Sequence, residues 1–504
     1  MPIRRQTGAA GGTRAALLAL FSALLISTGC MVGPNYKRPA APASPAFKEL
    51  PPAGAQNGWK EATPSDALLK GKWWEIYGDP ALNALEDQVA INNQNVLVAE
   101  ANFREAEAAV RVARAALFPT VSVGSSITES RTGGTLTPNG AVAASSLHTA
   151  YTIPLSATWS PDLWGSIRRT VRANSELAQA SSADLENARL LYQAELAEDY
   201  FNLHGLDSEY ELLDRTAKSY QEYLTLTRNR FAGGVASDLD VAQAESQLYS
   251  TQSSLQDLGV LRAEYEHAIA VLTGKPPSAL SIPALVLKSP PPSVPVALPS
   301  TLLERRPDIA GSERQMAAAN EQIGIATAAY YPTLTLSATA GLENSSFTKW
   351  FTWPSRFFSV GPSVSELIFD AGRRHAVIAE TSAAFDATIA SYRQTVLTAF
   401  QQVEDNLAAL RILAGEADTV AKDVDSSERA LTVSTAQYKA GTTSYLTVIT
   451  AQASALDAER NAVTLLTRRL VASVALVQAL GGGWDASELP TLKDVQAKSN
   501  TATK

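Results

Sequence analysis

The spacing of apolar residues predicts two very long helices. Apart from Gly205 and Gly415, nothing interrupts a helix from about Ser166 to Phe231 or from Gly372 to Tyr438. At about 1.5 Å per residue, some 65 residues span roughly 100 Å, which is longer than the diameter of a compact domain. These two segments therefore cannot fold inside an ordinary globular core.

A shorter apolar segment follows each long one, at about 238 to 272 and 445 to 480, so two helical hairpins are predicted. Apolar residues of the second hairpin recur every three or four positions, near the coiled-coil period. They are Ile389, Tyr392, Val396, Phe400, Val403, Leu407 and Leu410. The first hairpin has alanines that allow close helix packing, namely Ala173, Ala178, Ala180, Ala183, Ala188, Ala194 and Ala197. A soluble coiled coil would show the same stripe, so the stripe alone indicates no function.

Four shorter segments alternate apolar and polar residues, which is typical of strands with one apolar face. They cover about 119-133, 148-162, 332-345 and 356-370. Their apolar positions are Val121, Val123 and Ile127; Tyr151, Ile153, Leu155, Ala157 and Trp159; Leu334, Leu336, Ala338, Ala340 and Leu342; and Phe358, Val360 and Val364. Two strand hairpins are therefore predicted.

The alternation suits a soluble sheet over a core as well as a membrane barrel. Strand length and aromatic residues at both strand ends favour the barrel. The aromatics are Phe118, Trp159, Trp164, Tyr330 and Tyr331 at one end, and Trp350, Phe351, Trp353, Phe357 and Phe358 at the other. Four strands cannot close a barrel, which needs about eight, and lipid does not tolerate an open edge. A membrane form must therefore be an oligomer.

An internal repeat relates the two halves of the chain. ALFPTVSV (116 to 123) returns as AYYPTLTL (329 to 336), and RFAGGVASDLDV (230 to 241) returns as QYKAGTTSYLTV (437 to 448). Between these matches, Arg168 and Arg169 return as Arg373 and Arg374. Matches in one fixed order indicate two copies of one unit. The copies differ in length between residues 123 and 168, which predicts an exposed loop in that interval of each copy.

Composition excludes several classes of protein. The 504 residues carry a net charge of -8 and are 45% hydrophobic, unlike a disordered or a basic nucleic-acid-binding chain. Cys30 is the single cysteine, so an intramolecular disulfide or a multi-cysteine metal site cannot form.

The N-terminus has the layout of a bacterial secretory signal. Arginines precede the apolar run AALLALFSALLI (15 to 26), which is too short to span a bilayer. Gly29 and Cys30 then resemble a lipobox, in which Cys30 would be acylated, although Ser27 stands where that motif has an aliphatic residue. Ordinary cleavage with a free Cys30 is the alternative. Met31, in place of aspartate, favours the outer membrane.

The predicted organisation is a signal peptide (1-29), an acylated extended segment (30-78), a first repeat (79-274), a proline-rich linker (275-300), a second repeat (301-484) and a C-terminal tail (485-504) that looks weakly ordered. Pro307 suits the first position of a helix, and Asp308 suits the positive end of its dipole. The glycines at 481 to 483 are typical of a helix stop.

No catalytic, cofactor or metal constellation stands out. The four histidines, His148, His204, His267 and His375, are isolated, and each is read as a surface or packing residue. Phosphate-binding, nucleophile-elbow and kinase motifs are absent from the sequence. Glu195, Glu198 and Asp199 are expected on a solvated helix face.

Together these motifs resemble the outer membrane factor (TolC-like) family, and within it the OprM-like, NodT-type efflux lipoproteins. They are the lipobox-like GC before MVGPNYKRP, the F/Y-P-T strand starts, DLWGSIRR, IFDAGRR, RRPDI, the glycine turns and ALGGGW. The resemblance implies a mainly α fold with transmembrane β: a homotrimer whose 12-stranded barrel takes four strands from each protomer and continues into a periplasmic α-helical barrel.

The resemblance also implies a role. Such a channel is the passive exit duct of a tripartite efflux system in the outer membrane, beside outer-membrane lipid, with no nucleic acid as partner. It joins a periplasmic membrane-fusion adaptor and an inner-membrane pump, often of the resistance-nodulation-division type. The transported substrate cannot be read from the sequence. A type I protein secretion channel and a pore-less lipid-anchored coiled-coil scaffold remain as alternatives.

In the family the hairpin turns form a periplasmic tip that docks the adaptor and constricts the closed channel. The positions that match the tip are Gly233, Gly234, Ser237, Gly441 and Ser444, with Leu239 and Leu446 just beyond. Candidate gate residues are Asp238, Asp240, Thr447 and Thr450. The second turn has threonines where some relatives have aspartate. The acids of the first turn equally suit the start of a returning helix.

Overall fold

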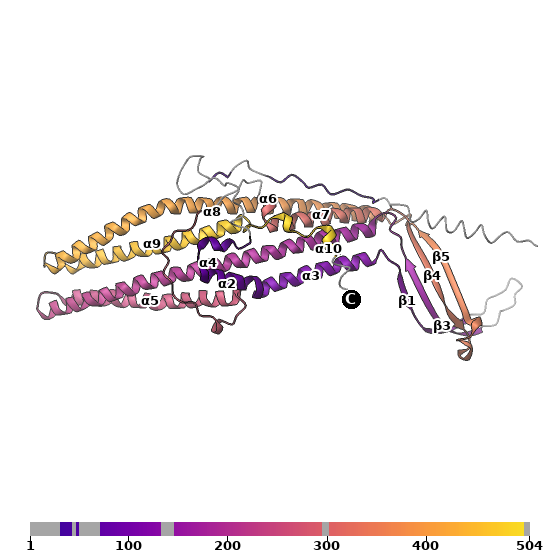
Figure 1. Cartoon of the computed structure of the whole chain (residues 1–504), viewed down its shortest axis with the longest axis horizontal. Coiled ribbons are helices and arrows are strands. Elements are labelled where there is room, and N and C mark those ends of the chain that lie inside the picture. The colour runs from indigo at the N-terminus through magenta and orange to yellow at the C-terminus, as the bar shows by residue number, and fades with distance from the viewer. Residues whose placement is uncertain (1–30, 43–46, 50–70, 133–145, 295–301, 498–504) are drawn as a thin grey trace, which may run out of the picture.

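The computed structural model describes residues 31–42, 47–49, 71–132, 146–294 and 302–497. The predicted signal peptide and Cys30 lie outside these residues, as does most of the predicted exposed loop of the first copy. Figure 1 shows an elongated molecule with a sheet at one end, two helical hairpin tips at the other and a helical body between them.

The first copy contains the helices α2 (Pro80–Asn92), α3 (Gln94–Ala115), α4 (Ser166–Ala232) and α5 (Asp238–Leu272) and the strands β1 (Thr120–Val123), β2 (Ser126–Thr132) and β3 (Ser146–Trp159). The second contains α6 (Leu302–Arg305), α7 (Pro307–Ala328), α8 (Arg373–Lys439) and α9 (Tyr445–Ala479), with β4 (Thr333–Asn344) and β5 (Arg356–Ser365). Helix α10 (Leu492–Ala497) follows in the C-terminal tail. Short 3-10 turns are η2 (Trp73–Tyr77), η3 (Pro277–Ala279), η5 (Phe347–Lys349), η6 (Trp353–Ser355) and η7 (Ala486–Glu488).

The two predicted long helices and their returning partners are confirmed. Helices α4 and α8 each have 67 residues, and α5 and α9 each have 35. Gly205 does not interrupt α4. A side chain there would overlap Thr467 of α9, so this glycine allows two helices to approach closely. The stripe around Tyr392 and Val396 is buried against neighbouring helices, as a coiled-coil spacing predicts.

The structure confirms the repeat and corrects one detail of it. Gly165 and Gly372 precede α4 and α8 with φ of 82° and 87°. Arg168 then donates through Nε to Asp162 at 3.0 Å, and Arg374 donates through Nε to Asp370 at 2.7 Å. Arg374 therefore makes the ion pair that Arg168 makes in the first copy, whereas the sequence repeat matched Arg374 with Arg169.

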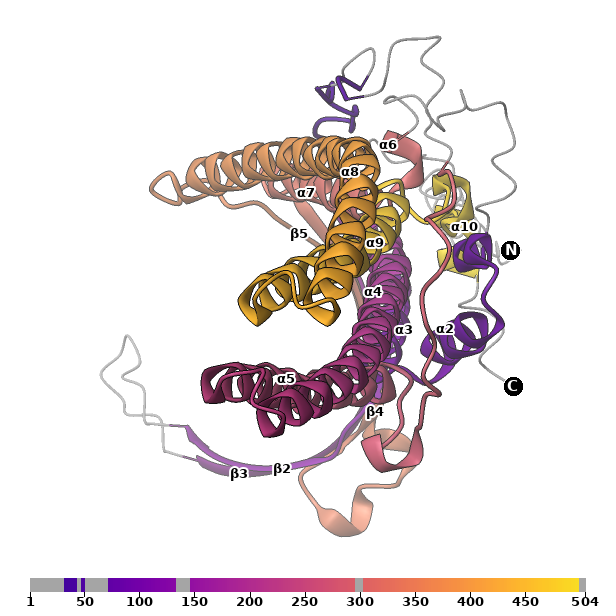
Figure 2. The ribbon, with the colours of Figure 1, turned by 90° about the vertical axis from the view of Figure 1, so that its left-hand side faces the viewer.

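The helices form an open arc when the molecule is viewed along its long axis, with α2 and α10 on the convex side (Figure 2). The main core lies mid-way along the arc. There Trp73 and Leu82 meet Tyr200 of α4, Val396 of α8 and Val474 of α9, all almost completely buried. The apolar α9 is long enough to cross a membrane by length and composition alone, but its inner face packs into this core.

The segment from Met31 to Pro34, called the strap below, is fastened by Arg169. Its guanidinium donates to the carbonyls of Val32 (Nε, 2.6 Å) and Gly33 (Nη2, 3.1 Å). It also donates through Nη1 to Glu321 of α7 at 2.7 Å. Gly33 lies directly on Gly324, where a Cβ would come within 2.6 Å of the Gly324 Cα. One buried ion pair therefore joins the strap, α4 and α7.

The linker after α5 is held on the helices by polar contacts. Asp207 accepts from Arg262 Nε at 2.7 Å and pairs with His204 Nδ1 at 2.8 Å, and it also accepts from the Leu285 backbone at 3.1 Å. Arg262 also donates to the Ile282 carbonyl at 2.7 Å. These bonds hold the pKa of Asp207 below its ordinary value, although burial opposes them. His204 is thus a buried packing residue.

Two expectations about chain order and exposure are wrong. The tail after Trp484 is predicted to be weakly ordered, yet its described part, up to residue 497, contains α10, whose Val495 is buried against Val110 and Ala178. Residues 498–504 of the tail lie outside the described residues. Glu198 and Asp199 were expected on a solvated face, yet both are partly buried. Burial, followed by repulsion from neighbouring carboxylates, raises the pKa of Glu198 to about 7 and that of Asp199 to about 6.

Replacing Glu198 by glutamine is expected to raise thermal stability at pH 8 and to change it little at pH 4.5. The folded state holds a proton that the unfolded carboxyl releases near pH 4.5, so Glu198 destabilises the protein increasingly as the pH rises to about 7. The gain above that window is about 1–3 kcal/mol, measured by thermal unfolding at the two pH values. Glu222→Gln, on an exposed site of α4, is the control. Equal gains at both pH values would contradict this prediction.

Candidate channel sheet and periplasmic tip

All strands join in one antiparallel sheet in the order β1-β3-β4-β5, with β2 also paired to β3. Strands β1 and β2 keep the same register on β3 and are separated by two residues, Gly124 and Ser125, opposite Pro154 and Ile153. Pro154 has no N–H to donate there. The two strands therefore act as one interrupted strand, giving the predicted four. Strand β5 ends at Ser365, earlier than predicted, because Ser365 pairs with Thr333, the first residue of β4.

The register places every predicted apolar position on one face. Leu155 lies between Val123 and Ala340, which in turn faces Phe358. The opposite face carries hydroxyl residues, such as Ser156 beside Ser122 and Thr339. Side chains on the apolar face, including Val121, Val123, Leu155, Phe358, Val360 and Val364, are exposed. The sheet is thus a single layer with an uncovered apolar face and a polar face.

Aromatic residues mark both ends of this sheet, as predicted. At the end near the helices, Trp164 stacks on Tyr331 with ring centroids 4.7 Å apart, and Trp159 donates to the Leu117 carbonyl at 3.0 Å. At the far end, Tyr151 contacts Trp350 at 5.5 Å between centroids. Aromatic residues at both ends of an apolar sheet face are typical of the interfacial girdles of membrane barrels.

The two hairpin turns at the opposite end of the molecule have the same geometry. Gly234 and Gly441 adopt φ of 75° and 78°, a left-handed conformation that favours glycine. The next residue donates back to the helix, from Val235 to the Arg230 carbonyl at 2.9 Å and from Thr442 to the Gln437 carbonyl at 3.0 Å. Both turns are therefore Schellman caps.

The returning helices start differently. Ser237 and Asp240 form a capping box, in which the Asp240 carboxylate accepts from the Ser237 backbone at 2.9 Å and Ser237 Oγ accepts from the Asp240 backbone at 3.2 Å. The equivalent Thr447 instead contacts Thr443 through their hydroxyls at 3.1 Å. Asp238 lies in the first turn of α5, and Thr450 donates to the Leu446 carbonyl at 2.9 Å.

Sequence reasoning missed the residues that join the two hairpins near their tips. Arg230 Nη1 donates to the Tyr438 carbonyl at 3.0 Å, and its guanidinium lies 4.6 Å from the centre of the Tyr438 ring. The hydroxyls of Tyr223 and Thr435 are 2.8 Å apart. Tyr438 also packs on Tyr445, with centroids 5.3 Å apart. The only available signal was an aromatic residue just before the second turn.

The tip also exposes apolar side chains. Phe231, Val235, Leu239 and Leu446 are all exposed although they surround tightly built turns. Exposed apolar residues grouped in this way mark contact surfaces for other proteins.

Within the residues that the structure describes, no group of three histidine, cysteine or acidic side chains could hold a metal ion.

Comparison with known proteins agrees with this architecture. A family model described as "Outer membrane efflux protein" matches residues 85–275 and 298–482. The chain is 31% identical over 468 residues to the solvent efflux pump outer membrane protein SrpC of Pseudomonas putida, covering 92% of this chain and 98% of that protein. It is 31% identical over 425 residues to the pyoverdine export outer membrane protein OpmQ of Pseudomonas aeruginosa, covering 84% and 89%.

The fold agrees as well. The outer-membrane channel OprN superposes with a TM-score of 0.82 at 29% identity, covering 90% of this chain and all of that one. The family model, the similar sequences and the similar structure each match most of the chain, and all three point to the same family. The chain belongs to the outer membrane efflux protein family and resides in the outer membrane.

Proposed function

We propose that this outer membrane efflux channel works as a homotrimer. The sheet carries this proposal, because within the described residues β1 with β2 and β5 are unpaired at their outer edges. An unpaired edge is not stable in lipid, whereas three copies of the sheet would close a 12-stranded barrel. The apolar face would then meet lipid, and the serine and threonine face would line a water-filled lumen.

The same closure would extend the lumen through the periplasm. The helices continue from the sheet as a curved layer (Figure 2). Three such arcs would complete a ring. Substrate would pass through it without an energy-consuming step. The energy comes from an inner-membrane pump, here proposed to be of the resistance-nodulation-division type. Acylated Cys30 would anchor each protomer to the outer membrane.

A periplasmic adaptor would dock at the tip. Gly233, Gly234 and Gly441 form exposed turns, and the neighbouring apolar side chains offer it a contact surface. Asp238, Asp240, Thr447 and Thr450 stay candidate gate residues. The capping box already gives the Asp240 carboxylate a structural role, so a role in gating would come in addition.

We infer that the substrates are small organic molecules. The relatives named above are a solvent efflux protein and a pyoverdine export protein, and neither name concerns a secreted protein. A type I protein secretion channel would share the fold, but no observation favours it. A pore-less scaffold is disfavoured because it would leave the apolar face of the sheet exposed to water.

Deletion of this protein is expected to increase sensitivity to solvents and drugs at least several-fold, because the whole export path is lost. Growth inhibition by a panel of solvents, drugs and metal ions measures this, and the secreted proteins are compared in parallel. The intact coding sequence supplied in trans is the control. Unchanged sensitivity together with a missing secreted protein would replace efflux by protein secretion.

A further inference from the structure

The turn that joins β4 to β5 lies at the end of the sheet that points away from the helices (Figure 1). Residues 345–356, called the outer turn below, run from the end of β4 to the first residue of β5. Strand β4 has 12 residues, and about 9–11 are enough for a tilted strand to cross a bilayer. In an outer membrane channel whose helices extend into the periplasm, the outer turn is therefore level with the outer leaflet.

The outer turn folds over the apolar face of the sheet. Tyr151 belongs to that face, and its ring centroid lies 5.6 Å from that of Phe347 and 5.5 Å from that of Trp350. Trp350 also packs on Phe351, with centroids 5.2 Å apart. Phe347 and Phe351 remain 63% and 70% exposed. The outer turn thus presents aromatic rings on the apolar side of the sheet.

Two basic residues accompany these rings. Arg356 pairs with Leu342 across the strands, so both lie on the apolar face. The Arg356 guanidinium lies over the ring of Trp353, and its Nε donates to the Trp353 carbonyl at 3.1 Å. Lys349 lies close by, because its carbonyl accepts at 2.8 Å from the hydroxyl of Ser355, the residue before Arg356. Both basic residues are exposed, so two positive charges border the apolar face.

No carboxylate of the described residues neutralises these two charges. Neither Lys349 nor Arg356 forms an ion pair within the part of the chain that the structure describes. Glu343 lies on the polar face of β4. Glu129 lies on β2, which β3 separates from β4. The interval 133–145, between β2 and β3, contains no acidic residue. The two positive charges of the outer turn are therefore available to a ligand.

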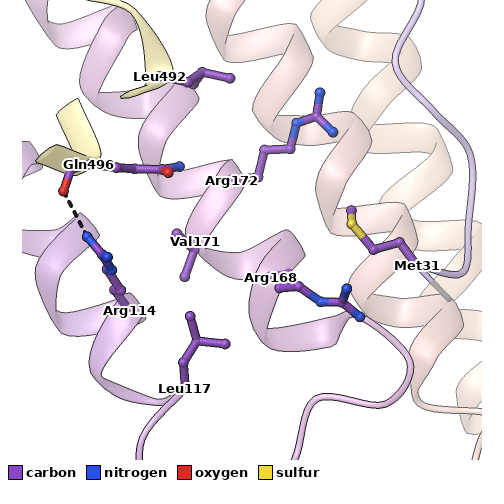
Figure 3. A pocket seen from close by; sticks show the side chains of 8 residues that line it. All are labelled: Met31, Arg114, Leu117, Arg168, Val171, Arg172, Leu492 and Gln496. Atoms are coloured by element: carbon purple, nitrogen blue, oxygen red, sulfur yellow. Dashed lines mark hydrogen bonds between the residues drawn. The ribbon is translucent and has the colours of Figure 1, made fainter. Parts of the chain in front are cut away.

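The arginines at the other end of the sheet are used differently. A cavity of about 460 Å³ is lined in part by Arg114, Arg168 and Arg172, but Figure 3 shows that their guanidinium groups point in different directions. Arg168 pairs with Asp162 at 3.0 Å, and Arg172 lies 3.6 Å from Glu321. These arginines hold parts of the chain together, whereas the basic residues of the outer turn contact no acid among the described residues.

We propose that the outer turn binds a phosphorylated glycolipid, the lipid that forms the outer leaflet of a bacterial outer membrane. Arg356 and Lys349 contact its phosphates, because guanidinium and ammonium groups both donate to phosphate oxygens. The exposed rings of Phe347, Phe351 and Trp353 pack on its sugars and on the upper part of its acyl chains, as aromatic side chains do at a membrane interface. This inference depends on the location in the outer membrane and is independent of the transported substrate.

The test is native mass spectrometry of the full-length protein in detergent without divalent cations, with added diphosphoryl or monophosphoryl lipid A of the same acyl chains. Wild-type protein is expected to retain the diphosphoryl form about fivefold better, since a basic residue near an anionic headgroup favours binding by roughly that factor. Lys349→Gln combined with Arg356→Gln should abolish this preference. The matched control is Arg111→Gln combined with Lys422→Gln, which removes two exposed basic residues of the helices and should keep it.

A conservative variant separates the charge from the conformation of the turn. Arg356→Lys keeps the charge but loses the bond to the Trp353 carbonyl, so it should keep most of the preference, unlike Arg356→Gln. Equal losses in these two variants would assign the effect to the conformation of the turn and overturn the charge contact. Equal retention of both lipids by wild-type protein, or equal effects of the outer-turn and control pairs, would contradict the proposal. Complete displacement of diphosphoryl lipid A by an equal concentration of phosphatidylglycerol would identify a general anionic-lipid surface and overturn the glycolipid assignment.

Discussion

Replacing Glu321 by alanine is expected to prevent stable assembly of the protein in the outer membrane. Glu321 and Arg169 have side chains that are 2% and 0% exposed, and their ion pair joins α4 to α7. Removing one member of a buried pair leaves an uncompensated charge, which costs about 3–5 kcal/mol. The guanidinium that loses its partner also fastens the strap through Val32 and Gly33. The amount of heat-labile oligomer in outer-membrane fractions measures the effect.

Glu100→Ala is the matched control for this variant. Glu100 pairs with Arg104 at 4.0 Å on the surface of α3, and an exposed pair of this kind contributes less than about 1 kcal/mol. A double variant, Arg169→Met with Glu321→Leu, removes both charges and should recover part of the lost stability. If Glu321→Ala assembled as well as Glu100→Ala, the buried ion pair between Arg169 and Glu321 would not be needed to hold α4 and α7 together.

Valine at both Gly234 and Gly441 is expected to reduce export to the level of the deletion strain while oligomers persist. Both glycines have left-handed backbones, and a side chain imposes about 1–2 kcal/mol of strain at each. The turn would change conformation, so the exposed apolar residues around it would lose their arrangement. Because each site lies outside the buried cores, assembly should survive. Sensitivity to the compounds identified with the deletion measures export, and heat-labile oligomer on gels measures assembly.

Gly259→Val combined with Gly415→Val provides the control for the tip. These glycines lie within α5 and α8, have open space around them and lack a positive φ. The same two substitutions are therefore made without strain in a turn. Normal export by the Gly234 and Gly441 double variant would refute a docking role for the turns. Loss of oligomer would instead show that the turns serve assembly.

The sequence predicted the helices and strands well because each has a long, uninterrupted period. The stripe through Tyr392 and Val396 could only be a helix face, and the alternation from Tyr151 to Trp159 could only be a strand. Helix α10 was missed, since six residues carry no period and its order comes from packing Val495 on α3 and α4. Tertiary contacts also explain the error at Glu198, because neighbouring elements bury a residue that looks solvated on its own helix.

The internal repeat and the glycines of the turns located the tip in the sequence. The structure confirms that Gly234 and Gly441 adopt a left-handed backbone conformation. The ties between the hairpins were not predictable, because Arg230 and Tyr438 are separated by most of the second copy. The same holds for Arg169, which served only as a repeat marker and proves to contact the strap and Glu321. Contacts between charged or aromatic groups far apart in a chain leave no periodic trace in it.

The equal lengths of the repeated helices restrict where this chain can tolerate insertions or deletions. Adding one residue to α4 alone would advance its tip by about 1.5 Å and rotate everything beyond by about 100°, so its buried stripe would face the wrong neighbour. Helix α8, fixed at the same 67 residues, would not follow. A tolerated insertion or deletion would therefore add or remove close to a whole number of helical turns, and it would do so in both α4 and α8. The interval between residues 123 and 168, where the copies differ in length and the sequence predicts an exposed loop, is the natural place to insert an epitope tag.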